Sequence, residues 1–237
     1  VEEFGPRVVS FHFGLPETRL LNRVKAAGCV VIASATTVAE ARWLEARGVD
    51  AVIAQGAEAG GHRGMFLTDD VASQPGTFAL VPQVVDAVGV PVIAAGGIGD
   101  ARGIVAAHAL GASAVQIGTA YLLTPESTIS PIYRAALKGA REDQTVLTNI
   151  FTGRPARGIV NRAIRELGPI CGEAPEFPNA ANAMLPLRMK AEAAGSGEFT
   201  SLWSGQAPGF AREVPAGEIT HALAARALAQ LNVAGTN

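Results

Sequence analysis

The sequence predicts an α/β fold, and within that class a barrel of alternating strands and helices. Short β-branched runs alternate with helical patterns, and the runs are apolar throughout, as in parallel strands that are covered on both faces. Each run also ends in small or polar residues, which suits the mouth of a barrel. An open sheet would gather such groups at one switch point, and none of these loops contains a G-x-G-x-x-G fingerprint.

Five runs are predicted to be strands. They are VVSFHFG from Val8, CVVIASA from Cys29, AVIAQG from Ala51, PVIAAGG from Pro91 and AVQIGT from Ala114. Consecutive strand and helix units place their strands side by side. We therefore expect these five strands to be neighbours in that order in one parallel sheet.

The intervening helices carry start and stop signals. Thr37 and Glu40 have the spacing of a capping box, and Asp100 is a candidate N-cap. Glycines stand where helix C-caps belong, at Gly28, Gly48, Gly89 and Gly111. One helical face is marked by Val81, Val84, Val85 and Val88.

One connection is unusually long, from Gln55 to the helix near Val81, and it contains the segment GGHRG at residues 60–64. Long loops in compact domains are often functional. Beyond Pro125 the strand pattern stops, and helical sequence punctuated by proline and glycine continues to the end. We expect residues 1–124 to form the barrel part, and residues 125–237 to form a smaller helical cap and the last barrel helix.

Composition favours a soluble globular protein with small-molecule partners. About half of the 237 residues are hydrophobic, 49%, which is enough for one sizeable core. The net charge of −2 is spread along the chain, so neither nucleic acid nor an anionic membrane is an expected partner. No apolar run could span a bilayer, and no leader opens the chain.

Two distant cysteines, Cys29 and Cys171, argue against a disulfide framework and a zinc site, so no metal is expected and a cytoplasmic location fits best. The chain starts at Val1 and reaches a strand-like run almost at once, which suggests a fragment.

Two glycine-containing segments are candidates for a phosphate site. AAGGI (residues 94–98) and QIGT (residues 116–119) end two successive strand units, where bare backbone amides can approach an anion. Barrels often bind phosphate with the loops after their last two strands. The alternative is that these glycines only allow tight turns.

His62 is the candidate catalytic residue. It stands among glycines in AQGAEAGGHRG, and histidine can transfer a proton or bind an anion near neutral pH. The alternative is a solvated loop histidine. Among the other histidines, His12 is a candidate for supporting the site, whereas His108 and His221 have the positions of structural helix residues.

These residues together resemble the nitronate monooxygenases, formerly called 2-nitropropane dioxygenases. The resemblance rests on AQGAEAGGHRG, on TFALVPQVVDAVGVPVIAAGGIGDARGIVAAHALGASAVQIGTAYLLTPES, on TGRPARGIVNR and on LWSGQA. It covers nearly the whole chain, and the combination is far more specific than any single motif.

The resemblance implies a (β/α)8 TIM barrel that binds FMN, with a smaller helical domain over the flavin. It implies oxidation of alkyl nitronates, such as propionate 3-nitronate, by O2 to carbonyl compounds and nitrite, without NAD(P)H. His62 would be the catalytic histidine. The residues that would bind the cofactor are Gln55, Gly60, Gly61, Gly96, Gly97, Gln116, Ile117, Gly118 and Thr119, with Ser34 as a lesser candidate.

The chain departs from the family pattern at its front, where members have a segment that supplies three further strands. We expect about five of the eight strand units here, with the remainder missing from the sequence or supplied by another chain. Two alternatives stay open. One is an NAD(P)H-dependent flavin reductase of the same superfamily, an enoyl-acyl-carrier-protein reductase or a quinone reductase, and the other is a non-catalytic truncated subunit.

Overall fold

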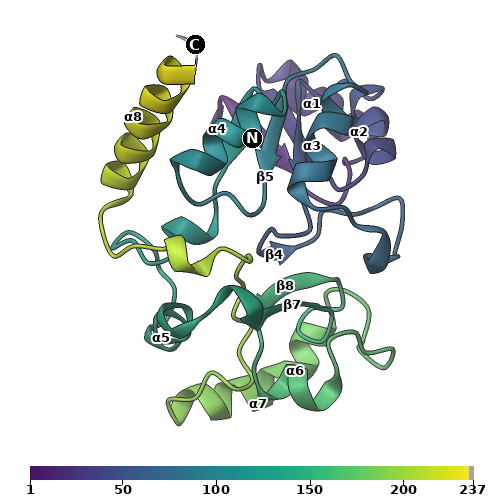
Figure 1. The fold of residues 1–237 in the computed structure, drawn as a ribbon. Coiled ribbons are helices and arrows are strands. Elements are labelled where there is room, and N and C mark those ends of the chain that lie inside the picture. Colours follow the sequence, from purple (N-terminus) through teal and green to yellow (C-terminus); the bar gives the residue numbers. More distant parts are fainter. Residues whose placement is uncertain (235–237) are drawn as a thin grey trace. The chain divides into compact units, whose positions relative to one another are not determined.

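The computed structural model describes residues 1–234, and the chain divides into two compact units (Figure 1). The first unit comprises residues 1–57, 64–96 and 104–116, and the second comprises residues 58–63, 97–103 and the chain from residue 117 onward. The predicted boundary between barrel and cap after residue 124 remains a prediction, because compactness alone does not define functional domains.

The first unit is built on one parallel sheet. Its strands are β1 (Val8–Phe11), β2 (Val30–Ala35), β3 (Ala51–Gln55), β5 (Val92–Ala95) and β6 (Ala114–Gln116), hydrogen-bonded in the order β1-β2-β3-β5-β6. Every pairing among them is parallel. The predicted α/β class, the strands and their order as neighbours are therefore confirmed.

Burial differs between the central and the outer strands. All five residues of β3 are buried, because β2 and β5 flank it and helices cover the sheet. In the outer strands Val8 keeps 50% of its surface exposed, and Ala114 and Gln116 are also exposed. Apolar character throughout a run thus predicted each strand correctly, but the burial on both faces that it indicated is wrong for β1 and β6.

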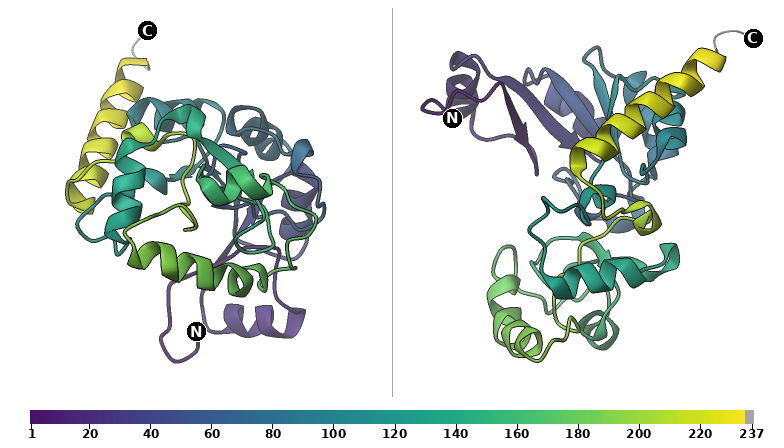
Figure 2. Two further views of the ribbon diagram at one scale, coloured as in Figure 1. Left: turned by 90° about the horizontal axis from the view of Figure 1, so that it is seen from below. Right: turned by 90° about the vertical axis from the view of Figure 1, so that its left-hand side faces the viewer.

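Helices join successive strands of this sheet. They are α1 (Thr18–Ala26), α2 (Val38–Glu45), α3 (Thr77–Val85) and α4 (Ala101–Ala109). Helix α2 packs against β2 and β3, and α3 packs against β3 and β5 (Figure 2, purple to teal). The core between them includes Leu44, Leu80, Val81 and Val84, each at most 1% exposed. Of the predicted valine face, Val81 and Val84 are therefore buried, whereas Val85 is half-buried and Val88 lies beyond the end of α3.

The capping prediction for α2 is only half correct. Thr37 Oγ1 accepts a hydrogen bond from Glu40 N at 3.2 Å, as an N-cap should. The Glu40 carboxylate does not return this bond to Thr37. Fully buried, it accepts instead from Thr36 N at 2.7 Å and from Phe66 N at 2.6 Å, so it joins the start of α2 to the long loop.

Other helix-end predictions have mixed outcomes. Asp100 Oδ1 accepts from Arg102 N at 3.0 Å and from Gly103 N at 3.2 Å, which confirms Asp100 as the N-cap of α4. The left-handed conformation expected of a C-cap glycine occurs at Gly28, Gly48 and Gly111. Gly89 lacks it, because α3 ends at Val85 and the chain reaches β5 through a longer connection.

The second unit contains a small antiparallel sheet that the sequence pattern did not predict. Its strands are β4 (Gly61–His62), β7 (Thr145–Thr148) and β8 (Ala156–Ile159), in the order β4-β8-β7. The expectation of purely helical sequence beyond Pro125 is therefore wrong. Both later strands are four residues long, and β8 reads ARGI, too short and too polar to show a strand period.

The helices predicted for the remainder are present. They are α5 (Pro131–Gly139), α6 (Arg162–Leu167), α7 (Ala180–Ala193) and α8 (Ala216–Ala234), and α8 runs as one long straight helix (Figure 2, yellow). Short 3-10 turns occur at η1 (Val71–Ser73), η2 (Thr119–Tyr121), η3 (Glu142–Gln144) and η4 (Pro208–Phe210). In the described part of the chain, no helix combines the length and apolar character needed to cross a membrane.

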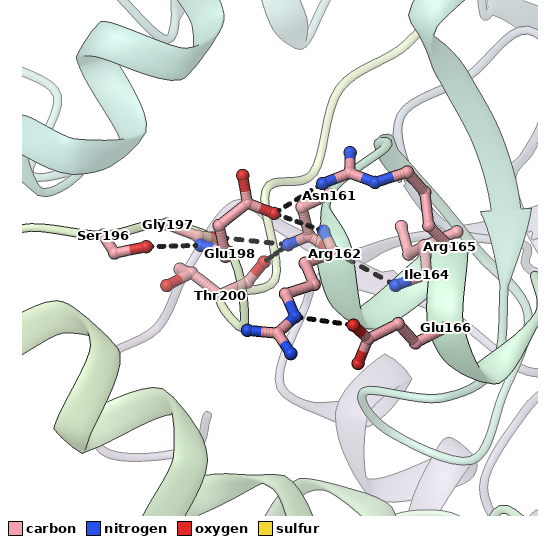
Figure 3. Close-up of polar contacts among 9 residues, drawn as sticks. All are labelled: Asn161, Arg162, Ile164, Arg165, Glu166, Ser196, Gly197, Glu198 and Thr200. Carbon is pink, nitrogen blue, oxygen red and sulfur yellow. Dashed lines mark hydrogen bonds and ion pairs between the residues drawn. The ribbon is translucent and has the colours of Figure 1, made fainter.

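Asn161 fixes the end of β8 to the segment after α7. Its Oδ1 accepts from Ile164 N at 3.3 Å and caps α6, while its Nδ2 donates to Gly197 O at 3.0 Å and to Thr200 O at 2.9 Å (Figure 3). The side chain is 3% exposed. One amide thus satisfies a helix terminus and two carbonyls of a distant loop.

Candidate functional site

Strand β4 fixes the backbone of His62. His62 pairs with Ala156 of β8, and Arg63 N donates to Pro155 O at 2.8 Å. The preceding Gly61 has φ +72°, a left-handed conformation that glycine adopts without strain. The predicted flexible loop is therefore an ordered two-residue strand at this point, and it places His62 beside the segment that leads into β8.

The contacts of the His62 side chain include one hydroxyl and two aromatic rings. Nε2 lies 2.8 Å from Thr152 Oγ1, a hydrogen-bonding distance. The ring centroid lies 5.9 Å from that of Phe177, edge to face, and 5.5 Å from that of Trp203. The imidazole is thus in contact with one hydroxyl and with two aromatic rings.

Trp203 is itself firmly held. The Trp203 backbone forms an antiparallel bridge with Gly158 of β8. The Trp203 ring packs edge to face on Phe151, with 5.8 Å between the ring centroids. The Tyr133 hydroxyl donates to Trp203 O, and burial raises the pKa of this phenol far above its usual value, so it remains a protonated donor. The aromatic surface beside His62 therefore belongs to a braced part of the second unit.

The segment after Trp203 packs closely on the loop before β4. A Cβ on Gly60 would lie 2.4 Å from Gly205 N, so no other residue fits at position 60 without a shift. Gly205 N donates to Thr119 Oγ1 at 2.9 Å, and Gln206 N donates to Glu58 O at 3.0 Å. Two predicted cofactor residues, Gly60 and Thr119, thus meet at Gly205.

A buried arginine lies next to this region. Arg157 of β8 is 8% exposed and donates from Nη1 to Thr145 O at 3.2 Å. Burial lowers the pKa of its guanidinium, and the negative charge of Glu58 opposes that effect. The charge of Glu58 therefore offsets part of the cost of burying the Arg157 guanidinium.

Two glycines of the second unit present bare backbone. Gly97 is exposed and has φ +70°, with Glu58 Cβ at 3.5 Å from the position of an added Cβ. Gly118 is also exposed, and an added Cβ there would meet no atom within 4 Å. Gly118 lies between Ile117 and Thr119, at the start of η2. Amides at such positions are open to an anionic ligand.

In the first unit, Ser34 and Gln55 lie where β2 and β3 end. Gln55 is 8% exposed, and its Oε1 accepts from Gly64 N at 2.7 Å. A Cβ on Gly64 would lie 2.9 Å from Ser34 Cβ and 3.0 Å from His12 Cε1, so these residues are crowded together. Ser34, Gln55 and His12 therefore lie close together at one edge of the sheet.

Gly96 and Gln116 lie at the same edge, after β5 and at the end of β6. Gly96 has φ +112°, and its carbonyl accepts from Thr77 Oγ1 at 2.9 Å, which joins it to the start of α3. Gln116 is exposed. The peptide bonds Gly96–Gly97 and Gln116–Ile117 connect these residues directly to the bare glycine loops of the second unit.

A match to a sequence-family model identifies the family of this chain. The family model described as nitronate monooxygenase matches residues 1–225. The chain belongs to the nitronate monooxygenase family. His62, Thr152 and Trp203 all fall inside the matched range.

Curated relatives agree with this nitronate monooxygenase assignment. The chain is 45% identical over 220 residues to a probable nitronate monooxygenase of Staphylococcus saprophyticus, covering 91% of this chain and 61% of the relative. It is 46% identical over 222 residues to a nitronate monooxygenase of Pseudomonas aeruginosa, covering 93% and 63%. The chain thus spans about three fifths of the length of these relatives.

Two solved structures have folds similar to that of this chain. A nitroalkane oxidase from Streptomyces ansochromogenes has a TM-score of 0.90 and 43% identity, covering 98% of this chain and 67% of that one. FabK from Thermotoga maritima has a TM-score of 0.78 and 34% identity, covering 99% and 72%. The fold of this nitronate monooxygenase family chain is therefore similar to that of two solved proteins with different names.

Three neighbours of His62 were missed by reasoning from the sequence. Thr152, Phe177 and Trp203 are far from His62 along the chain, and none stands in a pattern that indicates chemistry by itself. Thr152 and Trp203 do occur in TGRPARGIVNR and LWSGQA, the segments that carry the resemblance to nitronate monooxygenases. Those segments were the available signal.

Proposed function

We propose that this chain contains the catalytic and cofactor-binding residues of an FMN-dependent nitronate monooxygenase. The proposed reaction oxidises alkyl nitronates, such as propionate 3-nitronate, with O2 to carbonyl compounds and nitrite. The observation that carries the proposal is the setting of His62, which contacts a hydroxyl and two aromatic rings in a chain of this family. The names of the relatives support the choice of substrate.

The residues present fit FMN. Gly97 and Gly118 expose backbone at successive loops, and a Cβ at Gly118 would occupy space that is open in the chain, as a phosphate cradle requires. The proposed cofactor contacts are Gln55, Gly60, Gly61, Gly96, Gly97, Gln116, Ile117, Gly118 and Thr119, with Ser34 beside them. Bound FMN would supply the redox chemistry between nitronate and O2.

His62 has two proposed uses. Toward a neutral nitroalkane it acts as general base: the α C–H bond breaks, the electron pair stays on the nitronate, and the imidazole takes the proton. Toward a preformed nitronate it helps to bind the anion. The rings of Phe177 and Trp203 place apolar surface beside the imidazole, which would strengthen its interaction with a charged substrate that displaces water on binding.

We also propose that the parallel sheet belongs to a (β/α)8 barrel. Its support is the uninterrupted parallel order of five strands with ligand-type residues at their carboxyl ends. A cytoplasmic location is proposed because both Cys29 and Cys171 are free thiols.

The test is turnover by purified protein and a His62→Asn variant. Wild-type protein should retain FMN and release nitrite from propionate 3-nitronate with consumption of O2. Asn can form hydrogen bonds but does not accept a proton near neutral pH. Oxidation of neutral nitroalkanes by the variant should therefore fall about 10²–10⁴-fold. Preformed nitronates should lose less, because their α-proton has already left.

The matched control is His108→Asn, since His108 is an exposed residue of α4. It should keep wild-type rates and FMN content. Near-wild-type rates of His62→Asn on both substrate forms, with FMN fully bound, would remove His62 from the mechanism. Absence of nitrite from wild-type, FMN-loaded protein would refute the proposed activity.

A further inference from the structure

His62 and Trp203 occupy paired positions two residues apart along β8. His62 is paired with Ala156, and Trp203 is paired with Gly158. Side chains two positions apart on a strand project from the same face, and directly paired residues share that face. The imidazole and the indole therefore meet on one face of β8, with 5.5 Å between the ring centroids.

Gly158 provides the space for the indole ring on this face. A Cβ at position 158 would lie 3.1 Å from Trp203 Cε3 and 2.9 Å from Leu202 O, so both the ring and its backbone lie close to the bare strand. The ring also packs against a buried cluster that includes Phe151 and Met184. Trp203 is half-buried, so part of its apolar surface remains open.

The backbone that carries the indole ring is fixed to β8. Residues 202–206 form a segment that we call the strap. Ile159 N donates to Leu202 O at 2.8 Å, and Ser204 N donates to Arg157 O at 3.2 Å. Leu202 and Ser204 are both buried. The ring is therefore carried by a segment that cannot shift without breaking these bonds.

Tyr133 of α5 holds the centre of the strap. Its hydroxyl donates to Trp203 O, and its ring packs on a buried cluster that includes Leu137 and Leu202. Burial raises the pKa of the Tyr133 phenol far above its usual value, so the hydroxyl keeps its proton near neutral pH. The bond to Trp203 O is therefore present under ordinary assay conditions.

A substrate that reaches the His62 imidazole also comes close to the indole ring. Reacting atoms in a productive complex lie roughly 3–3.5 Å apart, a distance shorter than the separation of the two ring centroids. The nitronate group is polar and anionic, so the alkyl group is the part of the substrate that gains from leaving water. The indole offers that group an apolar surface next to the imidazole.

We infer that Trp203 is the residue that sets the preference for the alkyl group of the nitronate, and that Tyr133 is a positioning residue that holds the indole in place. This inference rests on the proposed function, and it adds to it the part of the substrate that the indole contacts. One apolar wall covers about half of the surface of each methylene, so each methylene should raise kcat/KM about twofold.

The test uses FMN-loaded protein and the preformed nitronates of nitromethane, nitroethane, 1-nitropropane and 1-nitrobutane, which differ in chain length. In wild-type protein kcat/KM should rise about eightfold over the series. Trp203→Ala should lose most of this rise, and Trp203→Phe, which keeps a smaller ring, should retain part of it. The ratio of kcat/KM for the longest and shortest nitronates is insensitive to a uniform loss of activity. Trp43→Phe changes the other tryptophan of the chain and should keep the wild-type ratio.

Tyr133→Phe tests the positioning role, because it removes the hydroxyl and keeps the ring. The ratio should fall about twofold, the effect of losing part of one net hydrogen bond. In a Trp43→Phe background Trp203 is the single tryptophan, and its fluorescence emission should move to longer wavelength as the ring becomes more exposed to water. Tyr121→Phe is the matched control, since the Tyr121 hydroxyl bonds to Thr220 Oγ1 at 2.9 Å and not to the strap.

Three results would overturn the role of Trp203. They are a flat series in wild-type protein, an unchanged ratio in Trp203→Ala, and a larger ratio in that variant, which would mean that the ring only restricts space. Unchanged ratio and emission in Tyr133→Phe would overturn the positioning role. Failure of the proposed function would appear differently, as FMN-loaded wild-type protein that releases no nitrite from any nitronate of the series, while the emission of Trp203 still responds to Tyr133→Phe.

Discussion

At the scale of single residues, Gly97 and Gly118 differ in the reason for which the chain has glycine. Gly97 needs glycine for its left-handed backbone, φ +70°. Gly118 has φ −107° and open space at the Cβ position, so the chain itself would tolerate a side chain there. A requirement for glycine at position 118 would therefore come from a ligand, which makes this residue the sharper probe of the proposed phosphate site.

Gly118→Val should weaken FMN binding at least about tenfold in Kd, because the side chain fills the space where phosphate oxygens would approach backbone amides. Fluorescence titration of flavin-depleted protein measures this. Gly172→Val is the matched control, since Gly172 is also exposed, with open space and no positive φ. Equal FMN affinity in Gly118→Val and wild type would contradict the phosphate assignment.

The sequence predicted His62 but not its environment, for a physical reason. Histidine among glycines is a local pattern, whereas Thr152 Oγ1 meets His62 Nε2 across 90 positions of sequence through the pairing of β4 with β8. Tertiary pairing of two short strands leaves no periodic trace in the chain. Two of the segments were visible in the sequence, but only the structure shows that Thr152, Phe177 and Trp203 contact His62.

At the scale of elements, local signals succeeded where one backbone segment decides the outcome. Thr37 and Asp100 cap their helices because a side-chain oxygen close in sequence can reach the first amides. Glu40 departs from its predicted partner because its carboxylate is buried against the distant Phe66 amide. A capping pattern predicts the start of a helix, but tertiary contacts decide where a long side chain bonds.

Asn161 makes both a helix-capping bond and tertiary hydrogen bonds, so its variants can separate the two contributions to stability (Figure 3). Asn161→Ala should lower the free energy of unfolding by roughly 2–4 kcal/mol, since it removes the N-cap and leaves two carbonyls without their donor. Asn161→Ser keeps a capping oxygen and should lose roughly half as much. Urea unfolding of both variants measures these values.

The control lies in the same helix. Glu166→Gln removes an exposed ion pair with Arg162 and should change stability little. A loss for Asn161→Ser as large as that for Asn161→Ala would show that the cap contributes nothing, and that only the two carbonyl contacts matter.

At the scale of the whole molecule, the strand order was predictable and the division into units was not. Consecutive β–α units leave few arrangements open to parallel strands, so their order follows from chain connectivity. The second unit includes two short segments from the earlier part of the chain, residues 58–63 and 97–103, together with the chain from residue 117 onward. This assignment depends on packing between residues that are distant in sequence, and no change in composition marks the two segments.

The comparison with solved structures also bears on the two activities that the sequence left open. Similarity to the nitroalkane oxidase exceeds that to FabK both in TM-score, 0.90 against 0.78, and in identity, 43% against 34%. This difference is consistent with the proposed function, under which the electrons come from a nitronate and not from a nicotinamide. A reductase of the same superfamily would need NADH or NADPH as its donor.

Anaerobic mixing distinguishes these two activities, because it measures which donor reduces the flavin. FMN-loaded protein mixed with propionate 3-nitronate should lose flavin absorbance rapidly, whereas NADH or NADPH at the same concentration should leave it unchanged on that time scale. Dithionite is the control, because it must bleach the flavin in either case and so shows that the bound cofactor can be reduced. Rapid bleaching by a nicotinamide, with no response to the nitronate, would assign the chain to the reductases. His62→Asn sharpens the result: a preformed nitronate needs no proton removal, so bleaching by it should persist in the variant while bleaching by a neutral nitroalkane is lost.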